Sequence, residues 1–219
     1  MSTQAKETTM AAITIIGTGN MASGIAARAA VAGKSVQILS RDASSAAALA
    51  ATVNGTSGIT GSPVEGSIVV LAAPFDASKA VLSSYGSALN GKTIVDISNP
   101  VNFETFDSLT VPAGTSAAEE LQALAPGASV VKAFNTVFAA TLADGEVDGQ
   151  TLDVLVAGDD AEATAAVVDF VKGAGLRPVN VGPLRRSREL EAFQLLVMTL
   201  QVSDAHPDYN WNSAVKLLP

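Results

Sequence analysis

A glycine-rich turn near the start of the chain is the residue pattern with the clearest chemical meaning. Residues 13–24 read ITIIGTGNMASG, so a β-branched run passes through Gly17, Gly19 and Ala22 into an alanine-rich stretch. In a strand–turn–helix unit the first glycine permits a tight turn, the second lets the backbone approach a phosphate, and the small third residue lets the helix pack on the strand. The helix N-terminus offers unpaired N–H groups and the positive end of its dipole. The pattern predicts a binding site for the pyrophosphate of a dinucleotide.

The residues after the next expected strand indicate which dinucleotide binds. A site that prefers NAD places an Asp or Glu there, about 20 residues beyond the glycines, to bind the ribose 2′-hydroxyl. Here the strand ends in Ser40 and Arg41, a hydroxyl and a guanidinium that can bind the 2′-phosphate of NADP. Two alternatives stay open: Asp42 would approach the ribose if the strand were longer, and residues 40–42 could form only a solvated turn and helix cap. The pattern favours NADP.

The rest of the chain alternates between expected strands and helices that would position these residues. Apolar or β-branched runs predict strands at 35–39, 67–72, 93–97, 129–133, 153–157 and 177–181. Helices are expected at 21–32, 43–51, 76–84, 161–173 and 187–202, and after a capping box formed by Ser116 and Glu119. This alternation predicts an α/β fold with a doubly wound, mostly parallel sheet of the Rossmann type.

The same reading divides the chain into three parts. Residues 1–10 are expected to be a loose N-terminal extension, 11–145 a dinucleotide-binding domain, and 146–219 a smaller C-terminal α/β part packed on it. The expected last helix, 187–202, is apolar on most sides, so it should be buried in the core or in a subunit interface. We therefore expect a homodimer that forms through this helix.

Composition excludes several kinds of site and partner. The 13 Lys and Arg residues face 21 Asp and Glu residues, and a net charge of -8 argues against nucleic acid or an anionic membrane as partner. Without cysteine and with one histidine, the chain cannot build a disulfide, a thiolate nucleophile or a multi-histidine metal site, so no metal is expected. The first ten residues lack the apolar segment of a signal peptide, and no run is long enough to span a membrane. We expect a cytoplasmic protein that acts on a small molecule.

No side chain stands out as a catalytic acid. A carbonyl or imine reductase would benefit from a proton donor beside the nicotinamide, but Lys132, Tyr85, Tyr209 and His206 have no supporting context. His206 and Trp211 lie in a polar tail, where a surface role for the first and a packing role for the second are the simpler interpretations. Hydride transfer to a flat, electron-poor ring needs positioning and exclusion of water more than it needs an acid. We assign no catalytic residue and expect an acceptor of this kind.

Further motifs together resemble a known family. They are IGTGNM, SRD after the second expected strand, LAAP at 71–74, DISNP at 96–100, VKAFNT at 131–136, GPL at 182–184 and the last helix with SRELE. Over residues 12–200 this set resembles the NADPH-dependent reductases of the deazaflavin coenzyme F420. The cytosolic reductase domain of the six-transmembrane ferric reductases is similar too.

The resemblance implies roles for particular residues. The implied pyrophosphate contacts are Thr18, Gly19, Asn20 and Met21; the 2′-phosphate contacts are Ser40 and Arg41; Ala73 and Pro74 would lie beside the nicotinamide ribose; and Asn135, Phe138 and Ala139 would line the nicotinamide and acceptor pocket. The chain departs from the archaeal deazaflavin reductases at Asn135, where those carry histidine, and at Phe138, where they carry proline. These two departures bear on which hydride acceptor is used and not on the prediction that NADP is the cofactor.

The sequence therefore predicts an oxidoreductase that transfers a hydride between NADPH and a deazaflavin. One alternative is an NADPH-dependent flavin or ferric reductase. Another is an imine reductase, which shares the GxGNM turn but carries a long helical C-terminal region for which 219 residues leave little room. A third is a non-catalytic NADP-sensing module whose last helix meets a partner.

Overall fold

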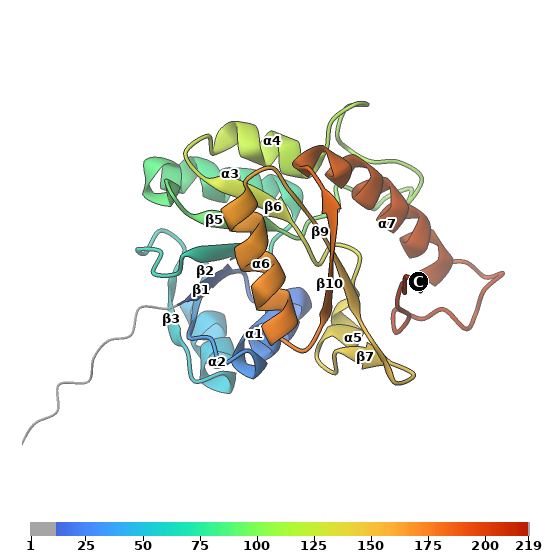
Figure 1. Cartoon of the computed structure of the whole chain (residues 1–219), viewed down its shortest axis with the longest axis horizontal. Coiled ribbons are helices and arrows are strands. Elements are labelled where there is room, and N and C mark those ends of the chain that lie inside the picture. Colours follow the sequence, from blue (N-terminus) through green and yellow to red (C-terminus); the bar gives the residue numbers. More distant parts are fainter. Residues whose placement is uncertain (1–11, 219) are drawn as a thin grey trace, which may run out of the picture.

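A single eight-stranded sheet forms the centre of the computed structural model, which describes residues 12–218 (Figure 1). The strand order is β10-β9-β6-β5-β4-β1-β2-β3. The strands are β1 (Ile13–Ile16), β2 (Val36–Ser40), β3 (Thr56–Ile59), β4 (Ile68–Leu71), β5 (Thr93–Asp96), β6 (Ser129–Lys132), β9 (Asp153–Gly158) and β10 (Arg177–Gly182). From β3 to β6 this is the order of the dinucleotide-binding Rossmann sheet, so the predicted fold class is confirmed.

Helices cover both faces of the sheet. Those that pack on one face through the larger apolar cluster are α1 (Asn20–Val31), α2 (Ala43–Thr52) and α6 (Ala161–Gly173). Those on the opposite face are α3 (Phe75–Tyr85) and α4 (Ala117–Leu124), with the short 3₁₀ helix η1 (Gly86–Leu89). Among the residues from 12 to 218, no helix is long and apolar enough to cross a membrane.

The strand directions fix where a ligand can bind. Strand β1 pairs in parallel with both β2 and β4, and the chain order reverses between β1 and β4. In such sheets ligands bind in the crevice outside the carboxyl ends of the strands at this reversal. The glycine turn leaves β1 at this point. Strand β9 runs antiparallel to β6, so the sheet is mixed and, as expected, mostly parallel.

The structure contains elements that the residue pattern did not predict. They are the edge strand β3, the one-turn helix α5 (Ala139–Leu142), the hairpin strands β7 (Glu146–Val147) and β8 (Gln150–Thr151), and the 3₁₀ helices η1 and η2 (Leu184–Arg186). Strand β3 reads TSGI and is exposed at three of its four positions, so it lacks the apolar signal of a central strand. The others are too short for periodicity to reveal them.

Of the predicted boundaries between parts of the chain, only the one at residue 145 lies within the described residues. The expected extension at residues 1–10 lies outside the described residues. Strands β9 and β10 continue the same sheet as the preceding strands, while the hairpin of β7 and β8 lies near the proposed boundary at residue 145. The division into two domains stays a prediction.

The last helix, α7 (Ser187–Gln201), is buried along one side only. Its buried side includes Leu190 and Met198 but also polar groups, among them Glu191 and Gln194. On the other side Leu196 remains 60% exposed. The polar residues of this helix therefore point largely into the molecule, and its outward apolar side chains are left for solvent or a second subunit.

Candidate dinucleotide and acceptor site

The glycine turn has the geometry that a pyrophosphate cradle requires. Gly17 adopts φ +130°, and a Cβ built on it would lie 2.2 Å from the carbonyl oxygen of Ala72. Gly19 is the N-cap of α1 with no side chain to cap the helix, and a Cβ on it would meet nothing within 4 Å. Ala22 is fully buried against the sheet. The free N–H groups of α1 thus face open space, which fits an anionic ligand.

The end of β2 presents a cationic and not an acidic side chain. The hydroxyls of Thr18 and Ser40 lie 3.5 Å apart across the turn. Asp42 is the N-cap of α2 and accepts hydrogen bonds from the backbone N–H and hydroxyl groups of Ser44 and Ser45. These hydrogen bonds, led by that of the Ser44 hydroxyl, lower the pKa of Asp42 to about 2. The Asp42 carboxylate is therefore engaged in helix capping, which leaves Arg41 as the charged group beside the cleft.

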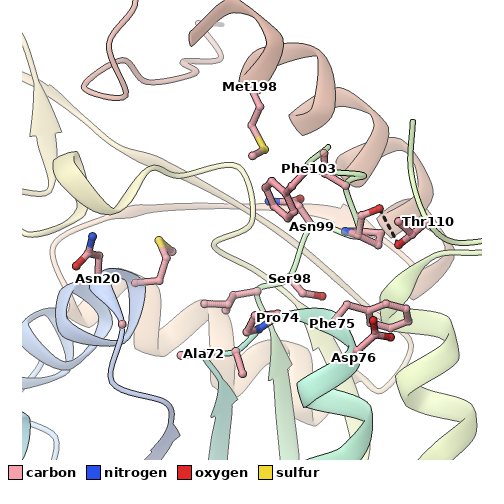
Figure 2. A pocket seen from close by; sticks show the side chains of 16 residues that line it. Asn20, Ala72, Pro74, Phe75, Asp76, Ser98, Asn99, Phe103, Thr110 and Met198 are labelled. Carbon is pink, nitrogen blue, oxygen red and sulfur yellow. Dashed lines mark hydrogen bonds between the residues drawn. The ribbon is translucent and has the colours of Figure 1, made fainter. Parts of the chain in front are cut away.

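Two recesses form a continuous cleft along the carboxyl ends of the strands. The Arg41 recess, of about 510 Å³, includes Gly17, Thr18, Ser40 and Arg41 in its lining. The Pro100 recess, of about 480 Å³, extends past the N-terminus of α1 to the loop after β5 (Figure 2). Both are lined by Gly19, Ala72, Ala73 and Pro74. In Figure 2, Asn20 lies at the start of α1, across the cleft from Pro74 and Phe75.

A third, smaller recess opens beyond the cleft. This Trp211 recess, of about 160 Å³, lies among the loop after β6, helix α7 and the C-terminal tail. It shares Met21, Ile97, Asn99 and Met198 with the Pro100 recess. The ring of Trp211 packs edge to face on Phe138, with 5.4 Å between the ring centroids. The third recess thus continues the line from the Arg41 recess through the Pro100 recess.

The structure places all twelve of the predicted binding residues in the lining of these recesses. The Arg41 and Pro100 recesses include Gly17, Thr18, Gly19, Asn20, Met21, Ser40, Arg41, Ala73 and Pro74; the Trp211 recess includes Asn135, Phe138 and Ala139. Their roles toward a ligand stay a prediction. The sequence assigned no individual binding role to Asn99, Gln194 or Met198, which also line the recesses.

Two asparagine side chains join the loops after β5 and β6. Asn99 Nδ2 donates to the backbone oxygen of Asn135 at 2.9 Å, and Asn135 Nδ2 donates to Asn99 Oδ1 at 2.9 Å. Asn135 Nδ2 also donates to the backbone oxygen of Leu190 on α7, at 3.3 Å. Phe134, the residue directly before Asn135, has φ +62°, a left-handed backbone conformation that few non-glycine residues adopt. This exchange fixes the wall on which the Trp211 recess is built.

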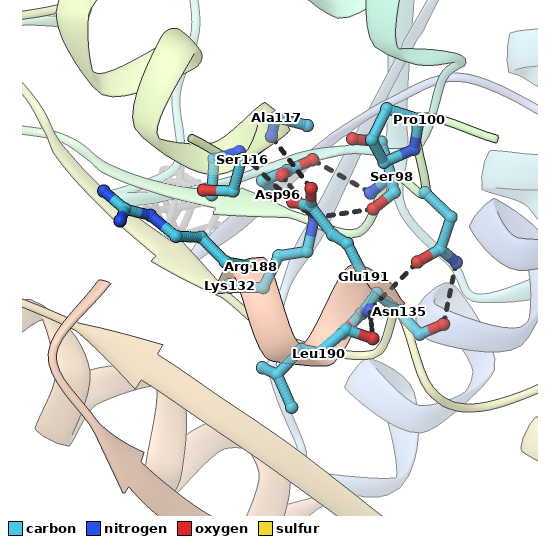
Figure 3. A network of polar contacts seen from close by, with 12 residues as sticks. Asp96, Ser98, Pro100, Ser116, Ala117, Lys132, Asn135, Arg188, Leu190 and Glu191 are labelled. Carbon is cyan, nitrogen blue, oxygen red and sulfur yellow. Dashed lines mark hydrogen bonds and ion pairs between the residues drawn. The ribbon is translucent and has the colours of Figure 1, made fainter. Parts of the chain in front are cut away.

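A buried ion network lies directly behind that wall (Figure 3). Lys132 Nζ bonds to Asp96 Oδ2 at 2.8 Å, Glu191 Oε1 at 2.7 Å and the Ser98 backbone oxygen at 2.6 Å. All three ionisable side chains are fully buried. Glu191 also accepts hydrogen bonds from the backbone N–H groups of Ala117 and Ala118 at the start of α4. One lysine thereby ties the ends of β5 and β6 to α7 and α4.

Burial and charge act in opposite directions on this network. Burial alone would lower the pKa of Lys132, but the two carboxylates outweigh it and raise that pKa. Burial raises the pKa of Glu191. The positive charge of Lys132 offsets this rise only in part, because Lys132 is shared between Glu191 and Asp96. Lys132 therefore stays charged at neutral pH and is enclosed away from the cleft.

The proton-donor candidates lie elsewhere than in the recesses. Tyr85 OH accepts a hydrogen bond from the Gly61 N–H and donates one to the Ser62 backbone oxygen, so its role is structural. His206 and Tyr209 are exposed and lie beside each other in the tail, with ring centroids 6.0 Å apart. Among residues 12–218, no group of three or more His, Cys, Asp or Glu side chains is arranged to hold a metal ion.

Comparisons with known proteins agree with this architecture. Residues 12–100 match the model of the family described as "NADP oxidoreductase coenzyme F420-dependent". The F420-dependent NADP reductase of Methanothermobacter marburgensis is 30% identical over 208 residues, an alignment that covers 86% of this chain and 91% of the relative. The metalloreductase STEAP3 of Rattus norvegicus is 34% identical over 187 residues, which cover 84% of this chain but only 36% of that protein.

A solved structure extends the comparison to almost the whole chain. A protein from Arthrobacter sp. FB24, solved as a candidate F420-dependent NADP reductase, superposes with a TM-score of 0.78 at 27% identity over 94% of this chain and 100% of its own. The relative from M. marburgensis and the geometry of the cleft both agree with this structural comparison. The chain belongs to the family of coenzyme F420-dependent NADP oxidoreductases and is an NADP-dependent oxidoreductase.

Proposed function

We propose that this enzyme transfers a hydride between NADPH and a deazaflavin of the coenzyme F420 type. The observation that carries the proposal is the chemistry of the Trp211 recess. Its described lining consists of apolar, aromatic and amide side chains, without Lys, His, Tyr, Asp or Glu. A carbonyl or imine acceptor would benefit from a proton donor there, whereas hydride transfer to a flat, electron-poor ring depends more on positioning and exclusion of water.

The cofactor would extend along the two larger recesses. In this proposal the turn at 17–21 holds the pyrophosphate, Ser40 and Arg41 bind the 2′-phosphate, and Ala73 with Pro74 lies under the nicotinamide ribose. NADPH, when bound, supplies the hydride, which carries two electrons and one proton; the reduced deazaflavin takes up one further proton from solvent. Asn99 and Met198 border both the Pro100 recess and the Trp211 recess, so they would help to hold the two rings face to face.

A direct assay separates this proposal from its alternatives. NADPH oxidation is followed by absorbance with a deazaflavin, with FMN or FAD, with a ferric chelate and with a cyclic imine. Turnover that is fastest with the deazaflavin supports the proposal, and turnover confined to a flavin, the ferric chelate or the imine replaces it with the corresponding alternative. An enzyme that binds NADPH but oxidises it with none of them contradicts the proposal and favours a sensing module.

Arg41→Ala tests the assigned cofactor preference. Loss of charge-assisted hydrogen bonds to a 2′-phosphate is expected to weaken NADPH binding by about tenfold to a hundredfold and to leave NADH binding unchanged. Titration calorimetry with both nucleotides measures this ratio. Arg185→Ala is the matched control, because Arg185 is also exposed but lies outside the three recesses. An unchanged preference for NADPH in Arg41→Ala would refute the role of Arg41.

We further propose that the enzyme is a homodimer in which the outward side of α7 meets a second copy. Phe193 and Leu196 are 39% and 60% exposed on this helix. Burying such side chains against a second copy would remove apolar surface from water. Leu196→Glu is expected to convert a dimer into a monomer at micromolar concentration, as measured by light scattering. A monomeric wild-type protein would contradict the proposal.

A further inference from the structure

Two buried amide oxygens in the Trp211 recess lack a hydrogen-bond partner. Asn135 is 2% exposed and Gln194 is 1% exposed, yet neither Asn135 Oδ1 nor Gln194 Oε1 has a partner among the described residues. Both side chains line this recess. Because an unsatisfied buried acceptor destabilises a protein, such groups require a particular explanation. A ligand with hydrogen-bond donors would supply one.

The hydrogen bonds of Asn135 determine which way its amide faces. Nδ2 donates to Asn99 Oδ1 at 2.9 Å and to the Leu190 backbone oxygen at 3.3 Å. Both partners are acceptors, so exchanging the amide oxygen and nitrogen would place oxygen against oxygen. Oδ1 is therefore the atom left unpaired, and the wall at Asn135 can accept but not donate.

The side chain of Gln194 is free both to accept and to donate a hydrogen bond. The structure gives its side chain no hydrogen bond to any residue from 12 to 218, although the residue is almost completely buried on α7. A carboxamide that accepts through Oε1 and donates through Nε2 is complementary to an edge in which an N–H group stands beside a carbonyl. The pyrimidinedione ring of flavins and deazaflavins has such an imide edge.

The C-terminal tail closes this recess as a fixed wall. The Trp211 backbone N–H donates to Gln201 Oε1 at 2.9 Å, which holds the indole beside Phe138. Further along, Asp153 Oδ1 pairs with Lys216 Nζ at 2.7 Å and Asp153 Oδ2 accepts from the Leu217 N–H at 2.8 Å. Burial alone would raise the pKa of Asp153, but hydrogen bonds from Arg177, Lys216 and Leu217 hold it well below its usual range. The Asp153 carboxylate, which anchors the end of the C-terminal tail, is thus ionised at neutral pH.

We propose that the Trp211 recess binds the imide edge of the hydride acceptor, with Gln194 pairing to the N–H and to a flanking carbonyl. The imide N–H is the single donor of this edge, so Asn135 Oδ1, which lines the same recess, can accept only by sharing that N–H with Gln194 Oε1. Trp211 with Phe138 covers the edge from solvent. This inference rests on the proposed function and deepens it, because it selects ring acceptors that carry an unsubstituted imide N–H. A ferric chelate or a simple cyclic imine has no such edge.

Trp211 provides a binding signal that does not depend on turnover, because it is the single tryptophan of the chain. The wild-type enzyme, saturated with NADP⁺ so that no hydride is available, is titrated with an oxidised deazaflavin while Trp211 fluorescence is followed. The same titration uses the analogue methylated at the imide nitrogen. We expect the native acceptor to quench Trp211 and the methylated analogue to bind about tenfold to a hundredfold more weakly.

Gln194→Met removes both hydrogen-bonding atoms at similar volume. In this variant the native acceptor is expected to bind as weakly as the methylated analogue, so discrimination between the two disappears. Thr199→Val on the same helix is the matched control, because Thr199 bonds only to the Leu196 backbone oxygen and lies outside the recess. The control should keep the wild-type discrimination.

Parallel NADPH-oxidation assays with the same acceptors distinguish the two levels of the proposal. Equal binding of both analogues by wild type, with normal deazaflavin turnover, would overturn the assignment of Gln194 and leave the proposed function intact. Neither quenching nor turnover with a deazaflavin would overturn both. Discrimination in wild type that persists in Gln194→Met would place the recognition of the imide edge elsewhere.

Discussion

Lys132→Met is expected to lower the free energy of unfolding by about 3–5 kcal/mol, because it leaves two buried carboxylates without a cation. Asp96 and Glu191 are both fully buried, and Lys132 is their shared partner. Methionine fills a similar volume but offers no charge and no N–H donor. The remaining groups must then take up protons or admit water, and either change weakens the packing of α7 on the sheet.

Urea unfolding followed by circular dichroism measures this effect. Lys172→Met is the matched control, since Lys172 is exposed on α6 and its loss should change stability by less than about 0.5 kcal/mol. If Lys132→Met unfolds at the same urea concentration as wild type, the network does not hold these elements together.

Glu191→Gln should be milder than Lys132→Met. Burial raises the pKa of Glu191, and a raised pKa in the folded state means that its ionised form opposes folding at pH values above the unfolded value of 4.5. Replacing Glu191 by neutral glutamine removes this surplus negative charge while Lys132 keeps Asp96 as a partner. A loss of stability as large as that of Lys132→Met would contradict this account of the charge balance.

Features formed by residues close together in the chain could be predicted from the sequence. The glycine turn is local, because β1, the turn and α1 follow one another within twenty residues, so spacing alone predicts the phosphate-binding geometry. The helix cap at Ser116 was also predicted from four residues, and the structure has Ser116 Oγ accepting from the Glu119 N–H at 3.2 Å. The Glu119 carboxylate, expected to bond to the Ser116 backbone N–H, instead accepts from the Ser116 hydroxyl at 2.7 Å. Local hydrogen bonds of this kind are readable from the residues that make them.

The ion network instead joins residues far apart in the chain. Lys132 meets Asp96 across neighbouring strands and meets Glu191 on a helix 59 positions later. In the sequence Lys132 stands out only as a candidate proton donor, and Glu191 is one polar residue of a helix that is apolar on most sides. Their roles follow from which side of α7 packs on the sheet, which the composition of the helix does not determine.

Gly17→Ala is the second substitution from which we expect a large effect, in both folding and cofactor binding. A Cβ at Gly17 would lie 2.2 Å from the carbonyl oxygen of Ala72, and that loop cannot retreat easily because the Ala72 N–H bonds to the Ile16 oxygen at 2.9 Å. The backbone φ of +130° adds strain for any L side chain. We expect a loss of stability of about 3 kcal/mol or more and NADPH binding weakened about a hundredfold or more.

Gly19→Ala separates the two effects, because Gly19 has φ -75° and open space where its Cβ would lie. Alanine there should lower the free energy of unfolding by no more than about 1 kcal/mol, the ordinary cost of alanine at a helix N-cap, since neither strain nor a clash arises in the protein itself. The same methyl group would stand where the proposed pyrophosphate approaches α1, so NADPH binding should weaken about tenfold or more. Thermal unfolding and calorimetric titration of both variants therefore test whether the space above Gly19 belongs to the ligand. If Gly19→Ala binds NADPH as tightly as wild type, the pyrophosphate does not approach α1 at this residue, and the cradle must be placed elsewhere along the cleft.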